Sequence, residues 1–182
     1  VNRAEMLKML YIAAGITPDP SSVRCFPDVE VGGWYEMYVC DATSRRYVQG
    51  YANGDFLPGN PVNRVEALKM IMEVLGITVD EISPEQKDIV NFVDVSTSAW
   101  YTKYLLSAFS KGVLPIAGQT GSRFYPEWPL LRGEAAAYIF NALYVDLTET
   151  RKEIEQATMQ DDETDTPPAS PPPPPPATAP PP

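Results

Sequence analysis

An Arg-x-Glu signature occurs three times in this chain, each time at the start of an apolar run, and it constrains the fold more than any other feature. The copies begin at Arg3, Arg64 and Arg132. In the first two copies an Asn precedes the Arg, and Asn-x-x-Glu has the spacing of a capping box, in which side chains at the two ends bond first-turn amides. The signature therefore predicts three helix starts, the third weaker because Leu131 occupies its cap position.

The apolar runs that follow predict helices over residues 3–14, 64–75 and 132–144. The first two runs end at Gly15 and Gly76, each followed by Ile-Thr. Glycine commonly ends a helix because it adopts a left-handed backbone without steric cost. We therefore expect both glycines to have a positive φ.

A second pattern begins at Trp34 and returns at Trp100, 66 residues later. Apolar residues at positions i, i+1, i+4, i+5 and i+8 from each tryptophan lie on one side of a helix. This agreement indicates an internal repeat. An aromatic-x-Asp-Val segment precedes each tryptophan, and we expect Asp28 and Asp94 to bond backbone amides of the turn before the helix.

Each Trp-Tyr helix is followed by a glycine-bearing loop that leads to the next Arg-x-Glu helix. In the first loop, Asn53 and Gly54 predict a tight turn in which both have a positive φ. Each loop carries one Phe-x-Pro segment, at Phe56 and Phe124. We expect these phenylalanines to anchor the loops in the core.

The 182 residues are enough to bury one core, but the C-terminal part has a different composition. Eleven of the twenty prolines lie at or after Pro167, and an acidic run precedes them. We predict repeat motifs over 1–145 (1–17 partial, 26–78 and 92–145 complete), a helical extension over 146–160 and an acidic, then proline-rich linker over 161–182. A linker of this composition favours disorder or an extended polyproline II spacer.

Charge and hydropathy exclude several partners. The formal net charge is −10, with no basic patch of the kind that binds nucleic acid or anionic lipid. No apolar run approaches the ~20 residues that span a bilayer, so membrane insertion is not expected. Since Val1 lies directly before the first motif, we interpret the chain as a processed or cropped segment.

The chain has no histidine and two cysteines, Cys25 and Cys40. Without histidine it lacks the usual general base and the commonest metal ligand, and two cysteines do not complete a zinc site. We expect neither a cofactor nor a metal site. The cysteines either form a disulfide, worth roughly 3 kcal/mol, or are two separate buried thiols. The sequence leaves both alternatives open.

The order of these elements resembles the S-layer homology motif: aromatic-x-Asp-Val, Trp-Tyr, a helix, a glycine loop with Phe-x-Pro, and Arg-x-Glu opening a second helix. The resemblance covers residues 1–145, as two whole motifs and the final helix of a preceding one. It implies an all-α fold of short helices and long loops around a pseudo-threefold axis. It also implies a non-catalytic extracellular module that holds proteins on the cell wall by binding wall polysaccharide, often pyruvylated, in grooves between motifs.

The chain departs from the family pattern at several positions. Arg46 replaces the earlier loop glycine, which the next repeat keeps as Gly112. Gly50 is the later loop glycine, and Ile116 replaces it in the next repeat. The first motif lacks its Trp half. We therefore expect one groove to be incomplete and the groove that uses Arg132 to be impaired.

Three kinds of group suit an anionic sugar: a guanidinium that binds a carboxylate through two parallel hydrogen bonds, backbone amides that approach the sugar closely, and an aromatic ring that stacks on the pyranose. Arginines at helix starts supply the cation, glycines the close approach, and tryptophans the face. The candidate ligand-binding residues are Arg3, Arg64, Arg132, Trp34, Trp100, Gly50 and Gly112. The alternative is structural: each arginine pairs only with an acid of the loop, and each tryptophan lies in the core.

Three functions remain in competition. The leading one is the wall-polysaccharide anchor, and the second is a structural or protein-interaction module that contacts other surface-layer chains without binding glycan. The third is a carboxylate-based glycan hydrolase, which is disfavoured because the repeated acids Glu5, Glu66 and Glu134 are accounted for as helix caps. Asn53-Gly54-Asp55 lacks the alternating ligands of a calcium loop.

Overall fold

The computed structural model describes residues 1–20, 24–79, 92–114, 123–145 and 148. The chain divides into a unit over Val1–Thr148 and a second over Glu149–Pro182, and only the first is described below. The expectations for Ile116, the helical extension over 146–160 and the proline-rich linker over 161–182 therefore concern positions outside the described residues, apart from residue 148.

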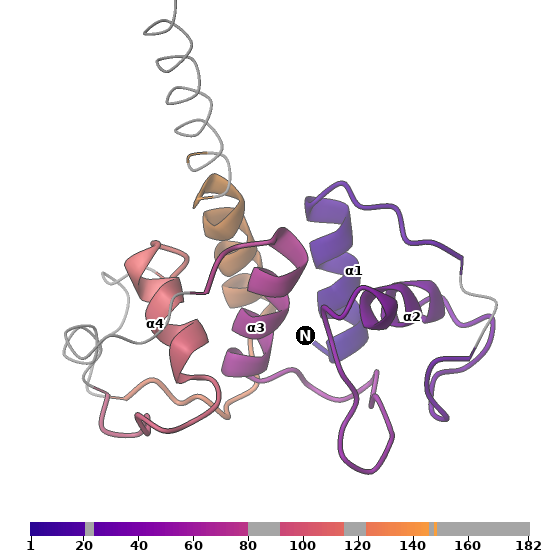
Figure 1. Cartoon of the computed structure of the whole chain (residues 1–182), viewed down its shortest axis with the longest axis horizontal. Coiled ribbons are helices and arrows are strands. Elements are labelled where there is room, and N and C mark those ends of the chain that lie inside the picture. The colour runs from indigo at the N-terminus through magenta and orange to yellow at the C-terminus, as the bar shows by residue number, and fades with distance from the viewer. Residues whose placement is uncertain (21–23, 80–91, 115–122, 146–147, 149–182) are drawn as a thin grey trace, which may run out of the picture. The chain divides into compact units, whose positions relative to one another are not determined.

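The described part of the first unit is helical (Figure 1). Its elements are α1 (Arg3–Ala13), α2 (Glu36–Ser44), α3 (Arg64–Leu75), α4 (Thr102–Ser110) and a further helix over residues 132–145. No strand occurs in the described ranges, which contain only two isolated bridges, Asn2 with Pro61 and Asn63 with Pro129. The predicted all-α class, with short helices and long loops, is confirmed.

The helix caps follow the sequence closely. The Asn2 side chain accepts from the Glu5 amide at 2.7 Å, and the Glu5 carboxylate accepts from the Asn2 amide at 3.0 Å. Helix α3 repeats this capping box with Asn63 and Glu66. In the third copy, the Leu131 amide still donates to a Glu carboxylate at 2.9 Å. Since leucine offers no acceptor, half of the box is lost.

Both predicted left-handed glycines are present, with φ of 66° at Gly15 and 65° at Gly76. The helices of the Trp-Tyr pattern begin later than their apolar pattern indicates. Trp34 and Trp100 lie in turns that precede α2 and α4. In the first turn the Glu36 amide donates to the Gly33 carbonyl, and in the second the Thr102 amide donates to the Ala99 carbonyl. The tryptophans therefore stand outside the helices.

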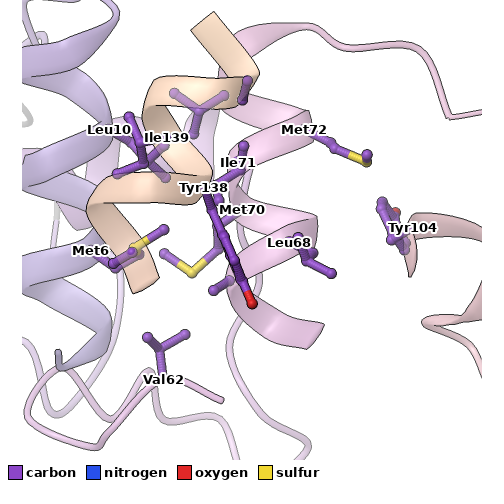
Figure 2. Close-up of a cluster of buried hydrophobic side chains, with 14 of the residues drawn as sticks. Met6, Leu10, Val62, Leu68, Met70, Ile71, Met72, Tyr104, Tyr138 and Ile139 are labelled. Atoms are coloured by element: carbon purple, nitrogen blue, oxygen red, sulfur yellow. The ribbon is translucent and has the colours of Figure 1, made fainter. Parts of the chain in front are cut away.

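The core lies where α1, α3 and the helix over 132–145 meet, with α2 packed on α1 and α4 on α3 (Figure 2). Figure 2 shows Met6 and Leu10 from α1 close to Met70 and Ile71 from α3 and to Ile139. All five side chains are buried. Burial of this apolar surface is the main stabilising contribution to the fold.

The loop phenylalanines are anchored as predicted, since Phe56 and Phe124 are completely buried. The expected role of the aspartates needs correction. Asp28 accepts from the amides of Phe56 and Leu57, at 2.9 and 2.7 Å, and Asp94 accepts from the equivalent pair. These carboxylates do bond backbone amides, but the amides belong to the following loop.

The tight turn of the first loop differs from the prediction in one respect. Gly54 has a φ of 88°, whereas Asn53 is not among the described residues with a positive φ. Asn53 acts through its side chain instead, since its carbonyl oxygen accepts from the Asp55 amide at 3.2 Å. This local bond replaces the left-handed backbone that we expected there.

A disulfide joins Cys25 to Cys40, with their Cα atoms 5.3 Å apart. It ties the segment before the first tryptophan to the middle of α2. The equivalent positions in the next motif are Asn91 and Leu106, so the bridge belongs to one motif alone.

One face of the third Arg-x-Glu helix is open. Tyr11 on α1 and Met72 on α3 are buried, whereas Phe140, the equivalent residue of the helix over 132–145, is 70% exposed. The reason is that α2 covers α1 and α4 covers α3, while no such helix covers this face among the described residues.

Candidate functional site

The three signature arginines form a closed cycle of ion pairs. Each arginine pairs with the glutamate of another signature copy, and the third copy closes the cycle on the first. The pairs are Arg3–Glu66, Arg64–Glu134 and Arg132–Glu5. The structural alternative predicted a pairing with loop acids, whereas the partners are the cap glutamates of neighbouring helices. This cyclic order matches the pseudo-threefold arrangement.

Arg3 is enclosed by protein. Its Nε donates to the Phe56 carbonyl at 2.9 Å and its Nη2 to the Gln49 carbonyl at 3.1 Å. Nη1 lies 3.4 Å from the Glu66 carboxylate, and the guanidinium lies 4.6 Å from the ring centroids of Tyr51 and Phe56. Only 6% of its side chain is exposed. Arg3 therefore has a structural role, because its hydrogen bonds join α1 to the loop that contains Gln49 and Phe56.

Arg64 occupies the equivalent position in the second copy and is also held. Its Nη1 donates to the Phe124 carbonyl at 2.6 Å, and Nη2 contacts Glu134. Its Nε is buried and has no hydrogen-bond partner within the described structure. Leaving a buried donor unpaired costs about 1–3 kcal/mol. The hydrogen bonds of the Arg64 guanidinium are therefore less complete than those of Arg3, whose Nε has an acceptor.

Arg132 is the opposite case, because 69% of its side chain is exposed. Its Nη2 lies 3.4 Å from the Glu5 carboxylate. The pKa of Glu5 is lowered from its usual value, chiefly because the Asn2 backbone amide donates to the carboxylate. Burial opposes this shift, and the positive charge of Arg132 adds a smaller lowering effect. Arg132 thus presents a solvent-facing guanidinium.

Two hollows on the surface are each lined by an arginine and a glutamate of different signature copies. The first, the Arg3 groove, has a volume of about 180 Å³ and is lined by Arg3, Tyr47, Val48, Gln49, Gly50, Tyr51, Glu66, Lys69, Met70 and Trp100. The second, the Arg132 groove, has a volume of about 490 Å³ and is lined by Glu5, Lys8, Met9, Ile12, Trp34 and Arg132. Both bring together residues from separate motifs.

The two grooves are built from equivalent positions. Each contains an arginine from one signature copy, a Glu-x-x-Lys-Met segment from another and the tryptophan that precedes the next helix. Glutamate and lysine share one helix face because they are three residues apart. The repeat therefore produces the same set of side chains twice.

A lysine lies beside the tryptophan in each groove. Lys8 Nζ is 5.0 Å from the Trp34 ring centroid, and Lys69 Nζ is 5.9 Å from that of Trp100. These are cation–π distances. Trp34 is 49% and Trp100 54% exposed, so the interpretation of the tryptophans as core residues is wrong.

The lysines were not predicted as site residues, although a signal for them was present. Leu-Lys-Met occurs at the same place in the first two signature copies, and its polar member alone falls on the surface side of the helix.

The third equivalent position has an incomplete set of side chains. It is the position of Arg64 and Glu134, where Ala137 stands in place of the lysine. The sequence holds three tryptophans, and Trp128 lies in a loop rather than before a helix, so the position also lacks its Trp-Tyr segment. The position of Arg64 thus has the incomplete set, whereas the Arg132 groove has the full set. The impaired binding that we expected of the Arg132 groove stays a prediction.

The family model of the S-layer homology domain matches residues 26–68 and 91–136, the two segments that supply the tryptophans, the loops and two of the three signatures. The chain contains S-layer homology domains. Together with α1, which carries the remaining signature, they form two whole motifs and the final helix of a preceding one.

Several known proteins carry similar S-layer homology regions. The surface-layer 125 kDa protein of Lysinibacillus sphaericus is 27% identical over 135 residues, covering 74% of this chain and 11% of that protein. The S-layer protein sap of Bacillus anthracis is 26% identical over 135 residues, covering 74% of this chain and 16% of that protein. An amylopullulanase of Thermoanaerobacterium thermosulfurigenes is 27% identical over 142 residues, covering 78% of this chain and 7% of the enzyme.

The chain thus spans less than a fifth of the length of these relatives. What it shares with them is an S-layer homology region, which is a non-enzymatic anchoring module of extracellular proteins at the cell surface. None of the helices in the described ranges is long and apolar enough to cross a membrane.

The two predicted glycines of the S-layer homology loops have different roles. A Cβ on Gly50 would lie 2.5 Å from Phe26 Cε1 and 2.9 Å from the Asp55 carbonyl oxygen, so the close approach is made by the chain itself. Gly112 has a φ of 78° and lines neither groove. Arg46, at the equivalent position, has a φ of 65°, which is unusual for a residue with a side chain.

Proposed function

We propose that this chain anchors its protein to the cell by binding an anionic wall polysaccharide in the Arg3 and Arg132 grooves. The observation that carries the proposal is the repeated set of arginine, glutamate, lysine and half-exposed tryptophan, which the chain assembles twice from separate segments. A fold requirement alone does not explain it, because the position of Arg64 does without the lysine and the tryptophan.

The chemistry of the set suits an acidic sugar. The exposed face of Trp34 or Trp100 offers an apolar surface for a pyranose ring. Beside it, Lys8 or Lys69 presents an ammonium group with three donors for a carboxylate such as a pyruvate ketal. The arginine of each groove compensates the glutamate charge through its ion pair, so the lysine charge remains available for the ligand.

The overall negative charge does not prevent such binding. The formal net charge is −10, but charges beyond a Debye length of about 8–10 Å are largely screened at physiological salt. Local charge at the groove decides affinity, and each groove has two cations for one glutamate.

The relatives named as surface-layer proteins suggest what is anchored. This chain spans 11% to 16% of the lengths of those relatives. We propose that the polypeptide attached to it is, as in those relatives, a surface-layer protein.

The proposal is tested by a Lys8→Ala/Lys69→Ala double variant with Lys103→Ala as its matched control. Lys103 also lies over an aromatic ring, at 5.3 Å from the Tyr104 centroid, but lines neither groove. We expect the double variant to lose at least about tenfold in affinity for purified wall polysaccharide, as measured by calorimetry, and the control to bind like the parent. Circular dichroism verifies that all three proteins fold.

The same measurement with polysaccharide from which the acidic substituents have been removed identifies the ligand group. We expect the parent to bind this polymer as weakly as the double variant binds the intact one. A folded double variant with the affinity of the parent would contradict the proposal.

A further inference from the structure

We propose that Tyr125 and Trp128 form an additional subsite that binds a neutral pyranose unit of the same polysaccharide. Their rings are stacked, with centroids 4.2 Å apart and an interplanar angle of 28°. Trp128 is nevertheless 58% exposed, so the outer face of its indole is open to solvent. This inference rests on the proposed function and extends it from the acidic unit to a second sugar.

The turn that carries these rings has a twin in the other complete motif. Leu57 and Tyr125 occupy equivalent positions and both have a φ of 58°. The Asn60 amide donates to the Leu57 carbonyl and the Trp128 amide to the Tyr125 carbonyl, each at 3.1 Å. The same backbone turn therefore forms with leucine and asparagine, and its folding does not require the aromatic pair.

The turn is also held in the same way in both motifs. The Arg64 amide donates to the Trp128 carbonyl at 3.1 Å, and the Arg3 amide donates to the Asn60 carbonyl at 3.0 Å. The Tyr125 amide donates to Asp94 at 2.8 Å. The backbone is held on both sides of the pair, and the two rings restrain each other by stacking, so less entropy is lost on binding.

The subsite lies at the end of the helix that lines the Arg3 groove. The side-chain amide of Asn63, the cap residue of α3, donates to the Glu127 carboxylate at 3.3 Å, and Glu127 lies between the two aromatic residues in sequence. Helix α3 continues from this cap to Glu66 and Lys69 of the groove. A polymer bound in the Arg3 groove and extending along α3 toward its N-terminus therefore reaches Trp128.

The neighbouring groups select the kind of ligand. The Glu127 carboxylate accepts hydrogen bonds from sugar hydroxyls and repels a carboxylate, which favours a neutral unit. Because Tyr125 and Trp128 are stacked on each other, they leave no slot between rings of the kind that holds a proline of a polyproline II ligand. A flat ring on the outer face of the indole fits this geometry.

The inference is tested with Trp128→Ala and with Asn60→Ala, its counterpart in the twin turn. Calorimetry is carried out with oligosaccharides of the wall polymer that contain one repeating unit and several. We expect Trp128→Ala to lower the affinity for the longer oligosaccharide about tenfold and to leave the shorter one unchanged, and Asn60→Ala to change neither. Trp128→Phe, which keeps an aromatic face, should retain most of the affinity.

The outcomes separate this inference from the proposed function. If Trp128→Ala binds the longer oligosaccharide as the parent does, while Lys8→Ala/Lys69→Ala loses binding, the subsite is wrong and the grooves stand. A synthetic peptide of residues 166–182 that binds the parent but not Trp128→Ala would also overturn the subsite, because its ligand would then be the proline-rich segment.

Discussion

The Arg3 and Arg132 grooves have the same set of side chains, yet their arginines differ strongly in solvent exposure and in hydrogen bonding. The Arg3 side chain is 6% exposed and bonds two loop carbonyls, whereas that of Arg132 is 69% exposed. The loop over residues 47–58 encloses Arg3, and among the described residues no such loop packs on Arg132. The residue at a repeated position thus takes its role from the segment packed on it.

The lysines and tryptophans behave differently from the arginines. In both grooves the tryptophan is about half exposed and lies within cation–π distance of its lysine. Each tryptophan also meets the following tyrosine edge-on, at 5.5 Å and 85°. What the grooves share is therefore a lysine–tryptophan surface, and this surface is our central candidate for ligand contact.

The largest expected difference between the two grooves is in stability. Arg3→Ala should lower the free energy of unfolding by about 3 kcal/mol or more, because it removes the cationic partner of the partly buried Glu66 and leaves two loop carbonyls without their side-chain donor. Arg132→Ala removes an exposed pair and should change it by less than about 0.5 kcal/mol. Urea unfolding followed by circular dichroism measures both, and equal losses would contradict the contrast.

The disulfide is a second difference between the two grooves. Trp34 of the Arg132 groove lies within the loop that the Cys25–Cys40 bridge closes, whereas no disulfide constrains the segment of Trp100. Cys25 and Cys40 are 15 residues apart, and closing a loop of this length stabilises by about 3 kcal/mol in the chain-entropy estimate. A Cys25→Ser/Cys40→Ser variant should therefore unfold at lower urea. Thiol titration of the unreduced, unfolded parent should find no free thiol, and two free thiols would refute the bridge.

A smaller effect is expected at the loop glycine that the two motifs do not share. Arg46→Gly should stabilise the protein by about 1 kcal/mol, because a side chain is unfavourable at a φ of 65°. Gly112→Ala, with a φ of 78° at the equivalent position, should destabilise it by a similar amount. Thermal unfolding of the two variants checks the opposite signs, and two shifts of the same sign would argue against backbone strain.

The smallest expected effect is the pH dependence of folding stability that comes from Glu5 in the Arg132 groove. The pKa of Glu5 is lowered from 4.5, so folding favours its ionised form. Its contribution is present above about pH 4.5 and is lost as the pH falls through the folded pKa. Glu5→Gln should lower stability at neutral pH and flatten the acid limb of the urea-stability profile. An unchanged limb would mean that the Asn2 amide does not stabilise this carboxylate.

Much of the fold was predictable because its signals are local. The capping boxes at Asn2 and Asn63 each depend on two side chains three positions apart, and the structure confirms both. The left-handed glycines follow from the absence of a Cβ, and the buried loop phenylalanines from hydropathy. The repeat spacing indicated which elements are equivalent.

The parts that the sequence did not reveal depend on contacts between motifs. The Arg–Glu cycle joins residues 63 to 127 positions apart, and its members were explained separately as caps and as ligand candidates. Burial of tryptophan is a tendency of the residue type, and here the turns before α2 and α4 place Trp34 and Trp100 at the surface. The site lysines lacked a partner until the fold brought each one next to a tryptophan.

The most direct test of the account is the number of binding sites for a short acidic oligosaccharide of the wall polymer. Isothermal titration of the parent should give two sites per chain, and Trp34→Ala or Trp100→Ala should each remove one site while leaving the other with its affinity unchanged. If either folded variant keeps both sites, or if one substitution abolishes all binding, the account of two separate lysine–tryptophan grooves is contradicted.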